Sequence, residues 1–218
     1  MENNCKSDNY NQIFALKERN ASKMTIQEIK EKALEDHIPI IMDDTLQKIN
    51  EILNEYKPKK LLEIGTAVGY SAICFEKYVS EEIDTIEQDE ERFVEAKRNI
   101  ESLELTNKIN LIKGNAIEIL QNMQINSEED KYDFVFIDAA KSKYPIFLQE
   151  ALRLTKNNAV IVADNVLYKG YVLSDYNKHK QRTAVRHLRE FLKMISENEN
   201  LESEILEIVD GLAIIKKK

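Results

Sequence analysis

The segment Leu61–Ser71, with the sequence LLEIGTAVGYS, limits the possible folds more than any other part of the chain. Its first half reads as an apolar strand that runs directly into a glycine-rich turn, and the turn opens a helix. Gly65 lets the backbone approach a ligand closely, and Gly69 permits tight packing of the helix against the strand. A turn of this kind at a helix N-terminus is typical of nucleotide-cofactor sites in α/β folds.

From Pro58 onward the sequence alternates between short apolar strands and helical patterns. The strands are almost continuously apolar, as expected for a parallel sheet that is covered on both faces. Asp210 and Gly211 separate the last two strands and indicate a hairpin. We therefore expect an α/β fold with a seven-stranded, mostly parallel sheet, a C-terminal antiparallel hairpin and helices on both faces. The predicted strands are Lys60–Ile64, Ile83–Ile86, Ile109–Ile112, Tyr132–Ile137, Ala159–Ala163, Glu204–Val209 and Leu212–Ile215.

The N-terminal part of the chain reads as helices. Thr25 opens a capping-box pattern, Pro39 breaks the helix that follows, and Asp43 is the expected cap of the next helix. We predict one domain of 218 residues, with N-terminal helices over 1–57 and an α/β core over 58–218.

Composition limits the cellular setting. The chain has no run of 18 apolar residues, so we expect no membrane span. Its N-terminus lacks the basic stretch and apolar run of a secretory signal. Cys5 and Cys74 are too few for a disulfide framework, and a reducing cytoplasm is the simplest setting.

A basic segment follows the fifth predicted strand. The net charge of −8 argues against a nucleic-acid partner, but positive charge is concentrated here. The pattern fits either a solvated helix face or a phosphate-binding surface. Its basic residues are Lys178, Lys180, Arg182, Arg186, Arg189 and Lys193.

Further candidate cofactor residues lie at the ends of the second and third strands. Glu87 lies 18 residues beyond Gly69, where its carboxylate can accept hydrogen bonds from both ribose hydroxyls. Asn115 and Ala116 follow Gly114 in a small-residue turn against which an adenine ring can lie, although this turn alone is also an ordinary helix cap. The glycine spacing is not GxGxxG and no GxxxxGK[ST] is present, which disfavours dinucleotides and nucleoside triphosphates.

Polar side chains also end the fourth and fifth strands. Asp138 follows one strand, and Asp164 and Asn165 follow the other. Ligands bind beyond the carboxyl ends of such strands, and two carboxylates with an amide oxygen suit Mg²⁺ or a similar cation. Lys141, three residues after Asp138, would lose its proton more easily near a dication and is a candidate general base. The alternative is that the aspartates cap helices and that the lysine is an exposed charge.

Together these segments carry a family resemblance. The sequences LLEIGTAVGYSA, FVFIDAAKSKY and VIVADNVLYKG resemble those of the class I S-adenosylmethionine-dependent methyltransferases, whose fold is Rossmann-like. Within that class the chain is similar to the metal-dependent O-methyltransferases that include the catechol and caffeoyl-CoA enzymes. It shares PIIMDD, IDAAK and the ending DGLAIIKKK with a bacterial branch, the tRNA 5-hydroxyuridine methyltransferases.

The resemblance implies a role for each matching residue. Asp138 would contact both the cofactor and the metal, with Asp164 and Asn165 completing the ligands of a divalent cation, expected to be Mg²⁺. Lys141 matches the catalytic lysine of the catechol enzymes, and Glu87 would bind the ribose of S-adenosylmethionine. The other cofactor contacts would come from Met42, Glu63, Gly65, Ala67, Gly69, Ser71, Asn115 and Ala116.

The leading hypothesis for the acceptor is 5-hydroxyuridine at the wobble position of tRNA, methylated to 5-methoxyuridine. Lys178, Lys180, Arg182, Arg186 and Arg189 would then contact phosphates. One alternative is a small catechol or caffeoyl-CoA-type phenol, and another is a non-catalytic module that binds S-adenosylmethionine or RNA. The chain lacks the aromatic gate of the catechol enzymes after Asp138, which leaves room for a bulkier substrate. The family also suggests a homodimer.

Overall fold

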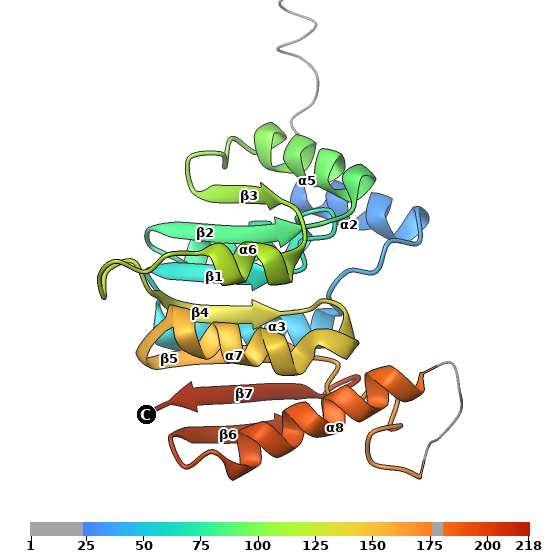
Figure 1. Cartoon of the computed structure of the whole chain (residues 1–218). Coiled ribbons are helices and arrows are strands. Elements are labelled where there is room, and N and C mark those ends of the chain that lie inside the picture. The colour runs from blue at the N-terminus through green and yellow to red at the C-terminus, as the bar shows by residue number, and fades with distance from the viewer. Residues whose placement is uncertain (1–23, 176–180) are drawn as a thin grey trace, which may run out of the picture.

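The computed structural model describes residues 24–175 and 181–218, and it confirms the predicted fold class. Seven strands form one sheet in the order β3-β2-β1-β4-β5-β7-β6 (Figure 1). The first five strands are parallel, and β7 runs antiparallel to both of its neighbours. The strands are β1 (Lys60–Ile64), β2 (Glu82–Glu87), β3 (Ile109–Lys113), β4 (Tyr132–Ile137), β5 (Thr155–Asp164), β6 (Leu201–Leu206) and β7 (Leu212–Lys217).

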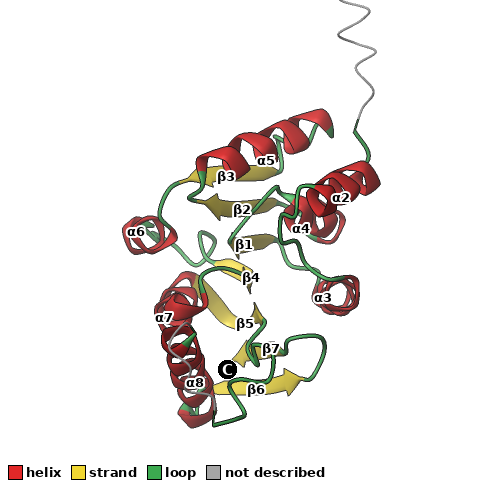
Figure 2. Cartoon of the chain, turned by 90° about the vertical axis from the view of Figure 1, so that its right-hand side faces the viewer, coloured by secondary structure: helices red, strands yellow, loops and turns green. Residues whose placement is uncertain are grey.

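Helices cover both faces of the sheet (Figure 2). One layer contains α6 (Ala116–Asn122), α7 (Tyr144–Leu154) and α8 (Arg182–Glu197). The opposite layer contains α2 (Ile26–Glu35), α3 (Asp43–Tyr56) and α4 (Tyr70–Phe75), while α5 (Glu90–Ser102) packs beside β3 and β2. Two 3₁₀ helices, η1 (Glu76–Tyr78) and η2 (Lys141–Lys143), complete the secondary structure of the described residues.

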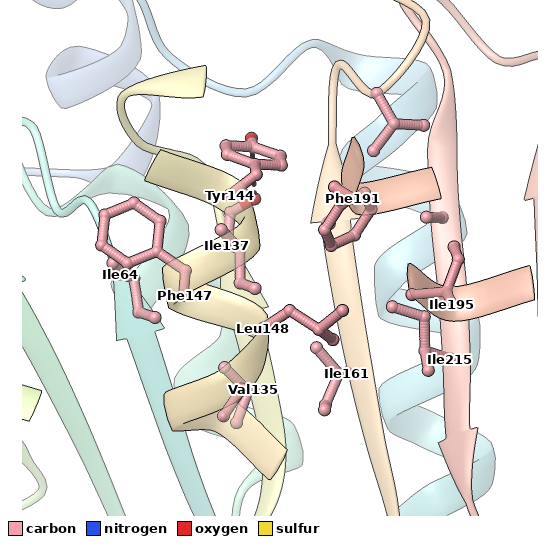
Figure 3. Close-up of a cluster of buried hydrophobic side chains, with 14 of the residues drawn as sticks. Ile64, Val135, Ile137, Tyr144, Phe147, Leu148, Ile161, Phe191, Ile195 and Ile215 are labelled. Carbon is pink, nitrogen blue, oxygen red and sulfur yellow. Dashed lines mark hydrogen bonds between the residues drawn. The ribbon is translucent and has the colours of Figure 1, made fainter. Parts of the chain in front are cut away.

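The apolar strand residues divide between two cores because successive side chains point to opposite faces. On one face Ile64 and Ile137 pack against Phe147 and Tyr144 of α7, while Phe191 and Ile195 of α8 lie on the side of Ile161 and Ile215 (Figure 3). On the other face Leu53 of α3 and Ile29 of α2 join a cluster that includes Phe75 and Phe136, whose rings meet edge to face at 5.4 Å. Within the described residues, no helix combines the length and the apolarity needed to cross a membrane.

The C-terminal hairpin differs from the prediction. The strand expected at Glu204–Val209 is shifted, because β6 occupies Leu201–Leu206. Residues 207–211 form a five-residue connection, with Val209 at φ 51° and Gly211 at φ 88°. The Asp-Gly pair is therefore not a two-residue turn, and its backbone bonds with the loop that follows β5.

The prediction that Asp43 is the N-cap of α3 is also wrong. Met42 is the N-cap and makes no side-chain capping bond, whereas Asp43 is the first helical residue. The carboxylate of Asp43 instead accepts hydrogen bonds from Lys30 Nζ at 2.6 and 2.8 Å. A charge in the first turn still interacts favourably with the helix dipole, which explains why the sequence pattern resembled a cap.

Candidate active site

A cavity of about 510 Å³ opens at the carboxyl ends of the parallel strands, bordered also by the segment between α2 and α3. Most of the predicted site residues meet here, although they come from six separate stretches of sequence. The parallel strands bring their following loops to one edge of the sheet, which is why the residues converge. The predicted residues that line the cavity are Met42, Gly65, Ala67, Ser71, Glu87, Asn115, Ala116, Asp138, Lys141, Asp164 and Asn165.

The glycine-rich turn after β1 is held against β2. The amides of Gly65 and Thr66 both donate to the carbonyl of Ile86 at 3.2 Å. Gly65 and Gly69 have φ values of 103° and 84°, which favour glycine, and Ala67 at 50° shares the left-handed conformation. Gly69 does not line the cavity, and a Cβ there would make only an ordinary contact with Ala96 Cβ at 3.5 Å, so its φ rather than tight packing favours glycine.

Glu63 supports this turn from beneath. Its side chain is completely buried, outside the cavity lining, and accepts hydrogen bonds from Ser71 Oγ and Thr85 Oγ1, each at 2.5 Å. Burial raises the pKa of Glu63 to about 7. The structure thus places Glu63 as a support for the turn, whereas the sequence suggested a direct cofactor contact.

Glu87 ends β2 at the cavity wall. Its two carboxylate oxygens accept hydrogen bonds from the amides of Ala67 and Asp89, each at 2.8 Å. Each oxygen keeps further accepting capacity toward the cavity, which suits the predicted ribose contact. The side-chain oxygen of Asn115 is engaged differently, because it caps α6 by accepting from the amides of Ile117 and Glu118.

The half-buried Asp138 and the buried Asp164 interact electrostatically with each other and with Lys141. Burial and the neighbouring Asp138 raise the pKa of Asp164 to about 7. Burial also raises the pKa of Asp138, and the ammonium of Lys141 opposes that rise. Two carboxylates held this close cannot both be ionised cheaply without a cation between them.

The donor set fits a hard divalent cation. Among the described residues no group of three or more His, Cys, Asp or Glu side chains is arranged to hold a metal. A third protein ligand at this pair would therefore be of another type, and the amide oxygen of Asn165, which lines the same cavity directly after Asp164, is the candidate. Oxygen donors of this kind are those that Mg²⁺ and Ca²⁺ prefer. Asn165 has φ 56°, a conformation that asparagine tolerates better than most residues.

Tyr144 joins the two strand ends that carry these aspartates, and sequence reasoning missed it. Its buried hydroxyl lies 2.7 Å from the carbonyl oxygen of Asp164 and 3.3 Å from that of Ile137. Burial raises its pKa well above the usual value, so the hydroxyl remains a donor. A tyrosine at the start of a helix carries no sequence pattern that would reveal this role.

Lys141 lies in η2 at the cavity wall. Its Nζ lies 6.0 Å from the ring centroid of Tyr168, a residue that the sequence did not single out. No carboxylate forms an ion pair with Lys141 among the described residues. Other lining side chains missing from the prediction include Tyr70, Gln88, Arg92, Lys143 and Phe147.

The basic segment only partly forms an open surface. Arg182 and Arg186 are exposed on α8. Arg189 instead donates to the carbonyls of Val172 at 3.0 Å and Tyr171 at 3.2 Å, and to that of Ser174. Lys178 and Lys180 lie outside the described residues.

Comparisons with known proteins agree with this geometry. A family model described as O-methyltransferase matches residues 22–218. A catechol O-methyltransferase of Niastella koreensis is 34% identical, covering 72% of each chain. A caffeoyl-CoA O-methyltransferase of Populus kitakamiensis is 28% identical over 78% of this chain and 74% of its own. An O-methyltransferase of Bacillus cereus, solved in complex with SAH, superposes with a TM-score of 0.80 at 25% identity, covering 88% of this chain and 90% of its own.

Proposed function

The chain belongs to the O-methyltransferase family and is an S-adenosylmethionine-dependent O-methyltransferase, and we propose that it methylates a small phenol with two adjacent oxygens, such as a catechol. The observation that carries this proposal is the pair Asp138 and Asp164, which lines one cavity together with Asn165, Lys141 and the glycine turn. The relatives named as catechol and caffeoyl-CoA enzymes support the same substrate class.

The chain's own residues would hold the two reactants in line. The turn at Gly65–Ser71 and Glu87 would bind the cofactor, while Asp138, Asp164 and Asn165 would hold a divalent cation. A bound cation would lower the pKa of an acceptor hydroxyl that it contacts. Nζ of Lys141, in its unprotonated form, would accept the proton of that hydroxyl, and the oxygen would take the methyl group from the sulfonium. Much of the acceleration would come from this positioning.

The tRNA hypothesis receives less support from the structure than the small phenol does. It needs α8 to present cations to phosphates, but the guanidinium of Arg189 bonds within its own chain. Arg182 and Arg186 remain exposed and available. The expected homodimer also remains a prediction; Ile26 and Leu34 of α2 are large apolar side chains that an interface could cover, with exposures of 42% and 54%.

A direct comparison of acceptors tests the proposal. Purified protein with S-adenosylmethionine is assayed on catechol and on tRNA containing 5-hydroxyuridine, at the same salt concentration, with Mg²⁺ or with a chelator. We expect Mg²⁺-dependent methylation of the catechol that tRNA does not inhibit. Turnover of the tRNA with none of the catechol would overturn the proposal and restore the tRNA hypothesis. Turnover of the catechol that the chelator does not reduce would refute the metal site alone.

A Lys141→Met variant tests the proposed base separately. Methionine keeps most of the side-chain volume but cannot accept a proton. We expect kcat to fall by about 100-fold or more while the affinity for the cofactor stays unchanged. Unchanged kcat would remove Lys141 from proton transfer.

A further inference from the structure

The loop that follows β5, residues 165–175, carries one residue that lines the cavity and another whose ring lies near Lys141. Asn165 starts the loop as the candidate amide ligand, and Tyr168 places its ring near the ammonium of Lys141. We propose that this loop, named here the acceptor loop, is held in place by anchors at its two ends, and that Arg189 is a positioning residue for methyl transfer. The inference rests on the proposed function, because that function is what makes the loop part of the site.

The first anchor is the β6–β7 connection. The amide of Val166 donates to the carbonyl of Gly211 at 3.0 Å, and the amides of Leu167 and Tyr168 donate to the carbonyl of Asp210 at 2.8 and 3.2 Å. The amide of Lys169 donates to the Asp210 carboxylate at 3.3 Å. Four consecutive amides of the loop therefore end on two residues of the C-terminal hairpin.

Packing reinforces the first anchor. A Cβ added at Gly211 would lie 2.4 Å from Leu167 Cγ, so only glycine fits against the loop at that position. The loop itself holds three residues with positive φ besides glycine, namely Asn165 at 56°, Tyr168 at 44° and Lys169 at 57°. Such conformations persist only where neighbouring structure enforces them, and the hairpin supplies that enforcement.

The second anchor is Arg189 of α8. Its guanidinium donates to the carbonyls of Tyr171, Val172 and Ser174, which lie in the last half of the acceptor loop. Arginine can do this because its planar group carries five donors in a fixed arrangement, whereas the single ammonium of lysine cannot span three carbonyls in the same way. The sequence suggested that Arg189 contacts phosphate, whereas in the structure its guanidinium binds backbone carbonyls of the acceptor loop.

The two anchors predict that loosening the acceptor loop affects metal and acceptor binding but not cofactor binding. The cofactor turn lies after β1, and neither anchor contacts it, so loosening the acceptor loop should leave cofactor binding intact. Metal and acceptor binding should both weaken, because Asn165 and Tyr168 would no longer be held in one arrangement.

The test compares Arg189→Ala and Arg189→Lys with Arg186→Ala, which removes a charge from the same helix at a residue with no anchoring contact. Four readouts are collected: hydrogen exchange of loop peptides, Mn²⁺ affinity by electron paramagnetic resonance, S-adenosylmethionine affinity by calorimetry, and KM and kcat for catechol. In both Arg189 variants we expect faster exchange of the loop, Mn²⁺ binding about 10-fold weaker and KM about 10-fold higher. Cofactor affinity should match that of the wild type, as should every readout of Arg186→Ala.

Other results would contradict either this inference or the proposed function. Arg189→Ala behaving like Arg186→Ala would overturn the inference, as would a parallel loss of cofactor affinity, which would indicate general damage to the fold. Full rescue by Arg189→Lys would show that charge rather than the forked geometry matters and would also overturn it. If the wild type neither binds Mn²⁺ nor methylates catechol, the proposed function fails, while the exchange data still decide whether Arg189 anchors the loop.

A second variant tests the first anchor independently. Gly211→Ala should push on Leu167 and speed hydrogen exchange at the start of the acceptor loop, with the same pattern of weaker Mn²⁺ binding and retained cofactor affinity. Unchanged exchange at residues 166–169 would contradict the role of the hairpin.

Discussion

Gly65 lies against the backbone of Asp138, so closely that a Cβ built on Gly65 would be 2.1 Å from the Asp138 carbonyl oxygen. The amide of Asp138 in turn donates to the carbonyl of Ile64 at 3.0 Å. The turn that we propose binds the cofactor and the carboxylate that we propose binds the metal are therefore parts of one packed unit, so a change in one should move the other.

Gly65→Ala should weaken cofactor binding and metal binding together. The added methyl meets backbone rather than a flexible side chain, and φ at this position is 103°, so we expect a loss of about 2–4 kcal/mol in the free energy of unfolding. Cofactor and Mn²⁺ affinity should fall together. Urea denaturation and calorimetric titration measure these effects.

Gly170→Ala is the matched control for that change. Gly170 also has a positive φ, 73°, but nothing lies within 4 Å of its added Cβ. Gly170→Ala should lower the free energy of unfolding by only about 1 kcal/mol, which is the conformational part of the penalty. Equal losses in the two variants would show that the contact with Asp138 contributes nothing.

Asp164→Ala should abolish metal-dependent methyl transfer without weakening cofactor binding. Asp164 ends β5, away from the glycine turn, so S-adenosylmethionine binding should survive while Mg²⁺-dependent methyl transfer falls by about 100-fold or more. Calorimetry and an activity assay check this, with exposed Asp44→Ala as a control for loss of a charge. Equal loss of cofactor binding and turnover would mean that the metal site is misplaced.

Glu87→Ala should weaken cofactor binding by about 1–3 kcal/mol, the range for losing hydrogen bonds to a charged group. Its carboxylate also accepts from the amides of Ala67 and Asp89, so part of the loss would come through the turn. Glu87→Gln keeps one acceptor oxygen and should lose less. Titration calorimetry of both variants provides the comparison, and unchanged affinity in Glu87→Ala would remove the ribose role.

The sequence predicted the sheet and the residues at its carboxyl edge because both depend on local patterns. Apolar runs define the strands, and Asp138 and Asp164 directly end two of them. Tyr144 and Arg189 could not be found that way, since each acts through carbonyls that lie far away in sequence or on another element. The hairpin shift has a similar cause: Asp-Gly is a strong local turn signal, but here its backbone is committed to the loop after β5.

Glu63 should make the metal-free protein less stable as the pH rises. Its pKa is about 7 in the folded protein against an ordinary value of 4.5, because burial disfavours the charged form. Between these values the unfolded side chain is ionised while the folded one keeps its proton, so folding takes up a proton. The free energy of unfolding should therefore fall with rising pH, by roughly 3 kcal/mol from this group.

Glu63→Gln isolates that contribution, because an amide has no proton to lose in this range. Urea unfolding at several pH values between 4.5 and 8, with a chelator and without cofactor, should show a flatter pH dependence for the variant than for the wild type. Asp164, whose pKa is also raised to about 7, contributes a slope of the same sign in both proteins, and Asp164→Asn measures it separately. Wild type and Glu63→Gln giving parallel curves would mean that Glu63 is already ionised in the folded protein, with its charge balanced by the hydroxyls of Ser71 and Thr85.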